Sequence, residues 1–260
     1  RNLHQPYIQV LTNRKGNVMC FSAEASFAGG VILSSVGAAT IHKVHKPSQI
    51  VFAAIPLFFG LQQIAEGIVW LVIPLSGYAD VKEVFTYVFL VMAEVIWPTL
   101  IALSVLFMEE DTRRRRTLWF LLGLGMLVSL YYAFCLFAYS VSPTIEGHHI
   151  YYHTDFPKMF ALPAFIAYLI ATITPLFVSS IKPTHLLGGL MFFSCLVTII
   201  FFTQYLISVW CFFAALISAV VYWILSDSKK AFKLENMRLL AERLKVPIRG
   251  KGGRELKSDE

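Results

Sequence analysis

The sequence has few charged residues for its length. Of its 260 residues only 15% are charged, whereas 57% are hydrophobic and 15% are aromatic. A soluble domain carries about 25% charged residues, so this composition excludes one large water-soluble core. A helix needs about 20 apolar residues to cross a hydrocarbon layer about 30 Å thick. Seven such helices would use about 140 residues, which leaves short loops and one tail but no room for a second folded domain.

Cysteine is also scarce, and its spacing indicates no disulfide framework. Three of the four cysteines lie inside apolar stretches, where a thiol behaves as a small hydrophobic group. The net charge is +6, but the basic residues cluster in alternate loops. This distribution is a signal of membrane topology and not of a nucleic-acid-binding surface, so we expect no nucleic-acid partner.

Seven long apolar stretches predict an all-α bundle of seven transmembrane helices. We place them at 22–41, 50–74, 84–108, 118–138, 159–181, 186–204 and 206–225. The last two form one apolar run that is too long for a single span, and we divide it at Thr203-Gln204-Tyr205. Lys and Arg concentrate in the loops 42–49, 109–117 and 182–185 and in the tail after Leu225. This alternation predicts a multi-pass plasma membrane protein with its N-terminus outside and its C-terminus inside.

The two ends of the chain differ from the apolar part, 19–226. Residues 1–18 are polar and lack the apolar core of a signal peptide. Because Arg14-Lys15-Gly16 can be encoded by a purine-rich ribosome-binding sequence, we expect translation to begin at Met19 and residues 1–18 to be untranslated or a disordered leader. Residues 227–246 have amphipathic helical spacing with basic residues, which suits anionic inner-leaflet lipids or a protein partner. Residues 247–260 are polar and predicted to be disordered.

Two acidic residues, Glu66 and Glu94, fall inside the predicted spans. Helix geometry puts them about 12 Å and about 15 Å below the same outer surface, in adjacent helices. Gln62 and Gln63 add amides one turn from Glu66, and Pro98 has no N–H to bond the Glu94 carbonyl. Ionisable groups in hydrocarbon usually face a cavity or a partner. These residues therefore predict a ligand-binding site or a proton relay. The alternative is that the acids are protonated and hydrogen-bonded to each other, or to Gln63, as a link between helices.

A second group of polar residues lies in the predicted outer half of the bundle, near the N-terminus and in the loop 139–158. Imidazole, thiolate and carboxylate groups bind zinc and other transition metals. His149 and His153 would share a face if the loop were helical. The alternatives are a solvated loop and a cysteine that is an interfacial apolar residue. The candidate metal ligands are Cys20, Glu24, His148, His149 and His153.

Two motifs resemble an uncharacterised bacterial and archaeal membrane protein family. Its members open with Met-Cys-Phe-Ser-Ala, as Met19–Ala23 does here, and continue with a Phe-Gly-x-Gln-Gln-x-x-Glu-Gly-x-x-Trp segment, which corresponds to Phe59–Trp70. The resemblance extends to about Leu225 and implies the seven-span fold. That family has no established activity, so the resemblance implies no chemistry, although it adds weight to four residues: Cys20, Ser22, Gln63 and Glu66.

Three kinds of function agree with these patterns. The first is an outward-facing site that binds a metal or a small polar ligand and could activate water to hydrolyse a lipid-like substrate. The second is a transporter or proton-coupled carrier in which Glu66 and Glu94 titrate. The third is a sensor or scaffold that acts through its basic tail. No known catalytic motif is present, so no catalytic residue is assigned and whether the protein is an enzyme stays open.

Overall fold

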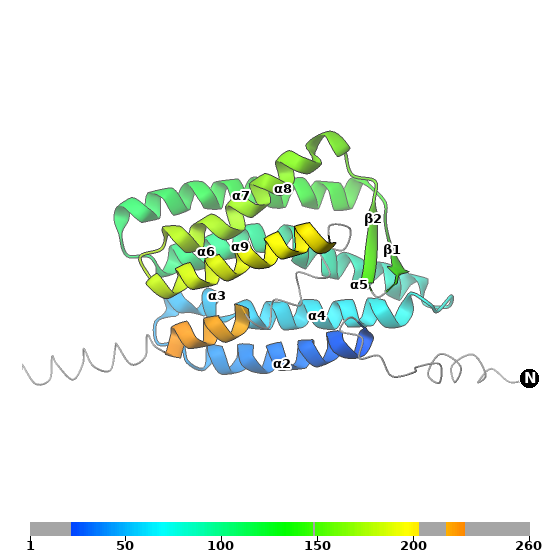
Figure 1. The fold of residues 1–260 in the computed structure, drawn as a ribbon, viewed down its shortest axis with the longest axis horizontal. Coiled ribbons are helices and arrows are strands. Elements are labelled where there is room, and N and C mark those ends of the chain that lie inside the picture. The colour runs from blue at the N-terminus through cyan, green and yellow to red at the C-terminus, as the bar shows by residue number, and fades with distance from the viewer. Residues whose placement is uncertain (1–21, 148, 203–216, 227–260) are drawn as a thin grey trace, which may run out of the picture.

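The computed structural model describes residues 22–147, 149–202 and 217–226, and Figure 1 shows most of them in long helices lying side by side. Within these residues, six helical segments are long and apolar enough to cross a membrane. They are Ala23–Ile41, Pro47–Val72, Ala79–Met108, Thr112–Ala138, Lys158–Val178 and Lys182–Ile200. The predicted seventh span, 206–225, is described only from Ile217, within the short helix Ile217–Ser226. The predictions for residues 1–18, 203–205 and 227–260 lie outside the described residues.

Helix α2 (Ala23–Ile41) packs closely along α4 (Ile55–Val72), through small residues on both helices. A Cβ atom added at Gly37 would lie 2.5 Å from the backbone nitrogen of Leu57, and one added at Gly60 would lie 2.9 Å from the Gly30 carbonyl oxygen. Only glycine at these positions lets the two helices lie this close together. Close packing through small residues is common between membrane helices. The short helices η1 (Pro47–Gln49) and α3 (Ile50–Ala53) connect the pair.

The third span is interrupted where the sequence places a proline. It comprises α5 (Ala79–Leu90), the π-helical segment η2 (Val91–Ile96) and α6 (Trp97–Met108). Pro98 cannot donate to the carbonyl of Glu94, and its ring crowds that carbonyl. The wider π turn lies directly before this position, and such turns occur mostly as single insertions within α-helices.

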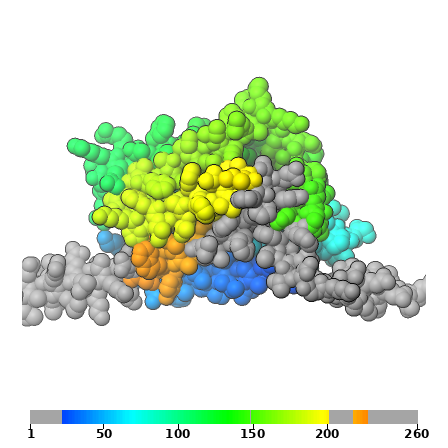
Figure 2. Space-filling model, in the orientation of Figure 1, coloured from blue at the N-terminus to red at the C-terminus, as the bar shows by residue number. Residues whose placement is uncertain are grey.

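Three helices complete the described bundle: α7 (Thr112–Ala138), α8 (Lys158–Val178) and α9 (Lys182–Phe202). The main apolar core lies between α3, α4, α6, α7 and α8 and includes Phe52, Ile101, Leu118 and Leu176. Figure 2 shows the helix Ile217–Ser226 on the face of the molecule that also carries α9 and α2. The Lys43 ammonium, just after α2, lies 5.8 Å from the centre of the Tyr222 ring.

The segment between α7 and α8 is a β-hairpin, so neither an all-helical fold nor a helical pairing of His149 with His153 is correct there. Strands β1 (Val141–Glu146) and β2 (His149–Thr154) are antiparallel, with Glu146 opposite His149. Gly147 supplies the positive φ, 62°, at the turn. Alternate residues of β2, Ile150 and Tyr152, are buried against α4, α5 and α7. Strand pairing and this period-2 burial together favour the hairpin over a helix. We call this end of the bundle the hairpin end.

The opposite end of the bundle carries Arg113–Arg116, and we call it the arginine end. A buried carboxylate links two loops at this end. Glu109 is 1% exposed and accepts hydrogen bonds from the backbone N–H groups of Ser180, at 2.6 Å, and Asp111, at 3.0 Å. Burial raises the pKa of Glu109, but these hydrogen bonds and the positive charge of Arg114 outweigh it and hold the pKa below its ordinary value. The charged form of Glu109 therefore links the α6–α7 loop to the α8–α9 loop.

A candidate polar site within the helix bundle

A buried amide joins the second and third spans. The indole Nε1 of Trp97 donates a 2.7 Å hydrogen bond to Oε1 of Gln62, whose side chain is buried. The ring of Phe59 stacks on Trp97 with 4.0 Å between ring centroids. The contact satisfies a polar atom of the amide in an apolar region, where an unpaired polar group is costly. It also fixes the register between α4 and α6.

The neighbouring polar pair lies within α4 and faces a different helix. Nε2 of Gln63 donates a 3.2 Å hydrogen bond to Oε2 of Glu66, and both residues are buried. Oε1 of Gln63 lies 3.7 Å from the position of a Cβ added at Gly29, so the amide faces α2. A bond between Gln63 and an acid was part of the alternative interpretation of the sequence, but here it joins residues of one helix and not two helices.

Glu66 and Glu94 are at similar depth in the bundle. The Gln62–Trp97 contact pairs two antiparallel segments. A helix rises about 1.5 Å per residue, so equal steps from this contact toward the same end of the bundle reach the same level. Four residues after Gln62 is Glu66, and four residues before Trp97 is the residue that precedes Glu94. The depth of both acids below a membrane surface stays a prediction, and nothing in the described contacts joins the two carboxylates directly.

The surroundings of Glu94 come from α7. Its carboxyl lies near enough to the phenol rings of Tyr131 and Tyr132 to interact electrostatically with them. Its Oε2 atom is buried and has no hydrogen-bond partner within residues 22–147, 149–202 and 217–226. A buried acid oxygen without a partner is costly when charged and less so when it carries a proton. At Glu66, by comparison, the Oε2 atom accepts a hydrogen bond from the Gln63 amide.

Side chains from two other helices cap the carbonyls around the π turn. The Tyr168 hydroxyl, from α8, donates a 2.7 Å hydrogen bond to the Ala93 carbonyl oxygen. The Ser129 hydroxyl, from α7, donates to the Val95 carbonyl oxygen. Broken helical backbone is tolerated at membrane depth where protein groups satisfy it. Glu94 is therefore held between two capped carbonyls, in a stretch of backbone that cannot adopt a regular α-helix.

The predicted metal ligands are not brought together in the part of the structure that is described. Glu24 is exposed near the start of α2, while His149 and His153 lie on β2. His153 Nε2 is 2.9 Å from the Thr144 hydroxyl and 3.7 Å from a Glu146 carboxylate oxygen. No group of three or more His, Cys, Asp or Glu side chains suited to a metal occurs among the described residues. Cys20 and His148 lie outside them, so the metal hypothesis stays a prediction.

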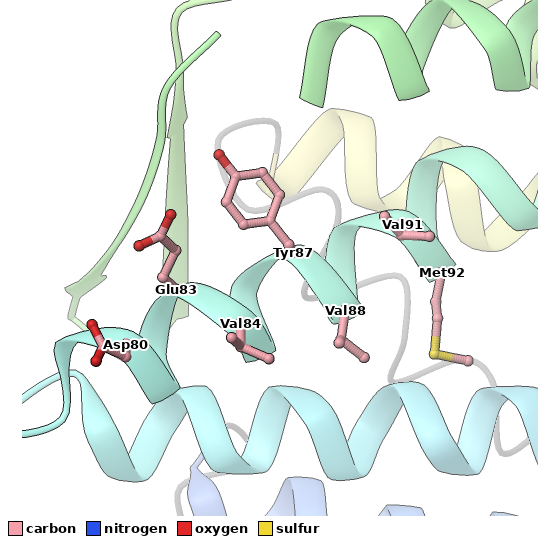
Figure 3. Close-up of a pocket in the computed structure, with 7 residues that line it drawn as sticks. All are labelled: Asp80, Glu83, Val84, Tyr87, Val88, Val91 and Met92. Atoms are coloured by element: carbon pink, nitrogen blue, oxygen red, sulfur yellow. The ribbon is translucent and has the colours of Figure 1, made fainter. Parts of the chain in front are cut away.

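A surface groove of about 570 Å³ runs along α5 and into η2 (Figure 3). Asp80 and Glu83 lie toward the hairpin end, and the rest of its lining is mainly apolar. Figure 3 shows Val84 and Met92 on the side of the helix opposite Tyr87. Neither Glu66 nor Glu94 is among the described lining residues. The groove and the polar groups are therefore separate features of the third span.

Three residues of this site were not predicted from the sequence: Trp97, Tyr168 and Ser129. Trp97 lies three residues after Glu94 and directly before Pro98. Its position beside the proline break could have indicated that it belongs to the site. Tyr168 and Ser129 lie 75 and 34 residues from the carbonyls they cap. Nothing in their local sequence indicates those contacts, which depend on helix packing.

The six apolar helices and the family comparison together define an integral membrane protein of unknown activity. The chain belongs to a family of unknown function, DUF6629, whose model matches residues 19–236. Neither the curated proteins nor the solved structures contain a match to this chain.

Proposed function

We propose that the protein is a proton-coupled membrane carrier in which Glu94 takes up and releases a proton inside the bundle. The observation that carries this proposal is the buried Oε2 atom of Glu94, which has no hydrogen-bond partner among the described residues and is located on a π turn. Intramembrane acids commonly serve as proton relays in transporters. π turns are frequent at functional sites.

The environment of Glu94 supports a titrating role over a purely structural one. A structural acid is expected to use its oxygens in hydrogen bonds, and the Oε2 atom of Glu66 does so with Gln63. The carbonyls on either side of Glu94 are already capped by Tyr168 and Ser129. Gain or loss of a proton at Glu94 therefore changes the charge at this point without first breaking a cap. Glu66, at a similar depth, is the second candidate for the relay.

The proposal includes the wider architecture predicted from the sequence. In it, the protein resides in the plasma membrane with seven spans, the last ending near Ser226. Its N-terminus and hairpin end are outside, and the arginine end is inside. The Lys and Arg residues of the alternate loops support this orientation. A basic tail at 227–246 would then meet the anionic inner leaflet.

Labelling with dicyclohexylcarbodiimide tests the proposal without knowledge of the transported solute. This reagent is apolar and reacts with protonated carboxyl groups, so we expect it to modify Glu94 and to modify it more slowly as the pH is raised. Peptide mapping by mass spectrometry locates the adduct. Glu83 and Glu110, which are exposed, serve as internal controls that should stay unmodified. Labelling of these exposed acids in preference to Glu94 would contradict the proposal.

A further inference from the structure

A second cavity lies at the arginine end of α7. It has a volume of about 340 Å³ and is lined by Thr112, Arg115, Arg116 and Trp119. Their spacing of three and four residues puts all four on one face of the helix. Arg116 is exposed, and Trp119 is 59% exposed. Arg115 is half-buried, and its Nη1 atom donates a 3.1 Å hydrogen bond to the Glu109 carbonyl oxygen, which positions the guanidinium at the cavity.

The positive charge at this cavity is not neutralised by the part of the protein that is described. Arg115 and Arg116 form no ion pair with any residue in 22–147, 149–202 or 217–226. The nearby acids are engaged elsewhere: Asp111 caps the amides of the first turn of α7, and the Glu109 carboxylate binds the loop at Ser180. Because the first-turn amides are already capped, the two guanidinium groups are the donors available to an anion.

The same face of α7 continues as an apolar strip. Residues three or four positions apart lie on the same helix face. From Trp119 toward the hairpin end, this face carries large apolar side chains. All of them are between 51% and 92% exposed. They are Met126, Leu127, Leu130, Phe134 and Phe137. Gly123 lies between Trp119 and this strip, and a Cβ added there would meet no atom within 4 Å. One face of α7 therefore combines a cationic cavity, an indole and a long apolar surface.

We propose that this face binds an anionic phospholipid, with its phosphate between Arg115 and Arg116 and one acyl chain along the apolar strip. Guanidinium groups suit phosphate because their donors match its oxygens in pairs. Indole side chains favour the boundary between headgroups and hydrocarbon, where Trp119 would lie. Basic pockets at membrane surfaces bind anionic headgroups. The site is independent of the polar groups around Glu94 and of the proposed proton coupling.

Native mass spectrometry of the full chain in detergent tests the site, with phosphatidylglycerol as the anionic lipid and phosphatidylcholine as the neutral one. We expect the unaltered protein to retain phosphatidylglycerol in preference. Arg116→Gln should weaken its binding about fivefold, and Arg115→Gln with Arg116→Gln about 20-fold or more, because each basic residue near the surface contributes a similar increment. Arg113→Gln with Lys158→Gln removes the same charge elsewhere and should leave the affinity unchanged.

Three results would overturn the proposal. The first is wild-type affinity for phosphatidylglycerol in the double Arg115/Arg116 variant. The second is an equal loss in the Arg113/Lys158 control, which would mean that only total charge matters. The third is displacement of the lipid by excess inorganic phosphate, which would identify a site for free phosphate. Melting temperatures in detergent verify folding, and the single change at exposed Arg116 keeps the test valid if the double variant does not fold.

Discussion

Replacing Gly125 by alanine tests the close contact between α7 and the first turn of α6, directly after the π turn. A Cβ added at Gly125 would overlap the carbonyl oxygen of Pro98 and lie 2.9 Å from its carbonyl carbon. These are backbone atoms, so no side-chain rotation can relieve the overlap and the two helices must separate. Gly123 is two residues away in the same helix, and a Cβ there meets nothing within 4 Å. Gly123→Ala is therefore a matched control.

The difference in unfolding free energy between Gly125→Ala and Gly123→Ala isolates the steric cost of the added methyl group. Alanine is favoured over glycine in a helix interior by about 1 kcal/mol, and this gain applies equally at Gly123 and Gly125. Overpacking costs about 1–3 kcal/mol. We therefore expect the free energy of unfolding of Gly125→Ala to be lower than that of Gly123→Ala by about 1–3 kcal/mol. The hydrogen bond from Ser129 of α7 to the Val95 carbonyl should also weaken, because it depends on the same separation of the helices.

Unfolding of the purified protein by sodium dodecyl sulfate, followed by circular dichroism, measures this difference. Both variants and the wild type are compared under one set of conditions, so the contribution of the detergent-unfolded state cancels. Equal unfolding free energies for Gly125→Ala and Gly123→Ala would refute the contact between α7 and Pro98. So would a Gly125→Ala variant more stable than the wild type.

Other contacts give predictions that the same unfolding assay checks. Tyr168→Phe removes the cap on the Ala93 carbonyl and should lower the unfolding free energy by about 0.5–2 kcal/mol. A double-mutant cycle of Gln62→Leu and Trp97→Phe should give a coupling energy of about 0.5–2 kcal/mol, and zero coupling would contradict the hydrogen bond. The pKa of Glu109 is depressed by folding, so its stabilisation is present above the ordinary pKa and is lost as the pH falls through the folded value. Glu109→Gln should lower stability at neutral pH and flatten this acid-side decrease.

Hydropathy predicted most of the helices because the bilayer constrains their length and composition so strongly. The described spans begin and end within several residues of the predicted ones; for example, 84–108 corresponds to Ala79–Met108. Helix α2 shows where a simple pattern stops being sufficient: small residues recur at every fourth position from Ser22 to Ala38, a spacing typical of close helix packing in membranes. Ser22, Ser26 and Gly30 are buried, but Ala38, four residues beyond Ser34 in the same series, is exposed. Steps of four residues drift around a helix of 3.6 residues per turn, so the series leaves the interface.

The hairpin and the surroundings of Glu94 could not be read from local sequence. Strand β1 contains Pro143, which obscures a strand signal, and the tertiary burial of Ile150 fixes the pairing. Pro98 correctly marked a break near Glu94, because a missing N–H is a local property. Tyr168 reaches that break from another span, and only the packing of α8 against it determines the contact.

The most direct test of the account is an infrared pH titration of the purified protein, compared with Glu94→Gln. A protonated carboxylic acid has a carbonyl band distinct from that of a carboxylate. If Glu94 titrates, the wild type shows a band that disappears reversibly as the pH is raised. This band is absent from Glu94→Gln, whereas Glu83→Gln retains it. The same pH-dependent band in wild type and Glu94→Gln would contradict the claim that Glu94 takes up and releases a proton.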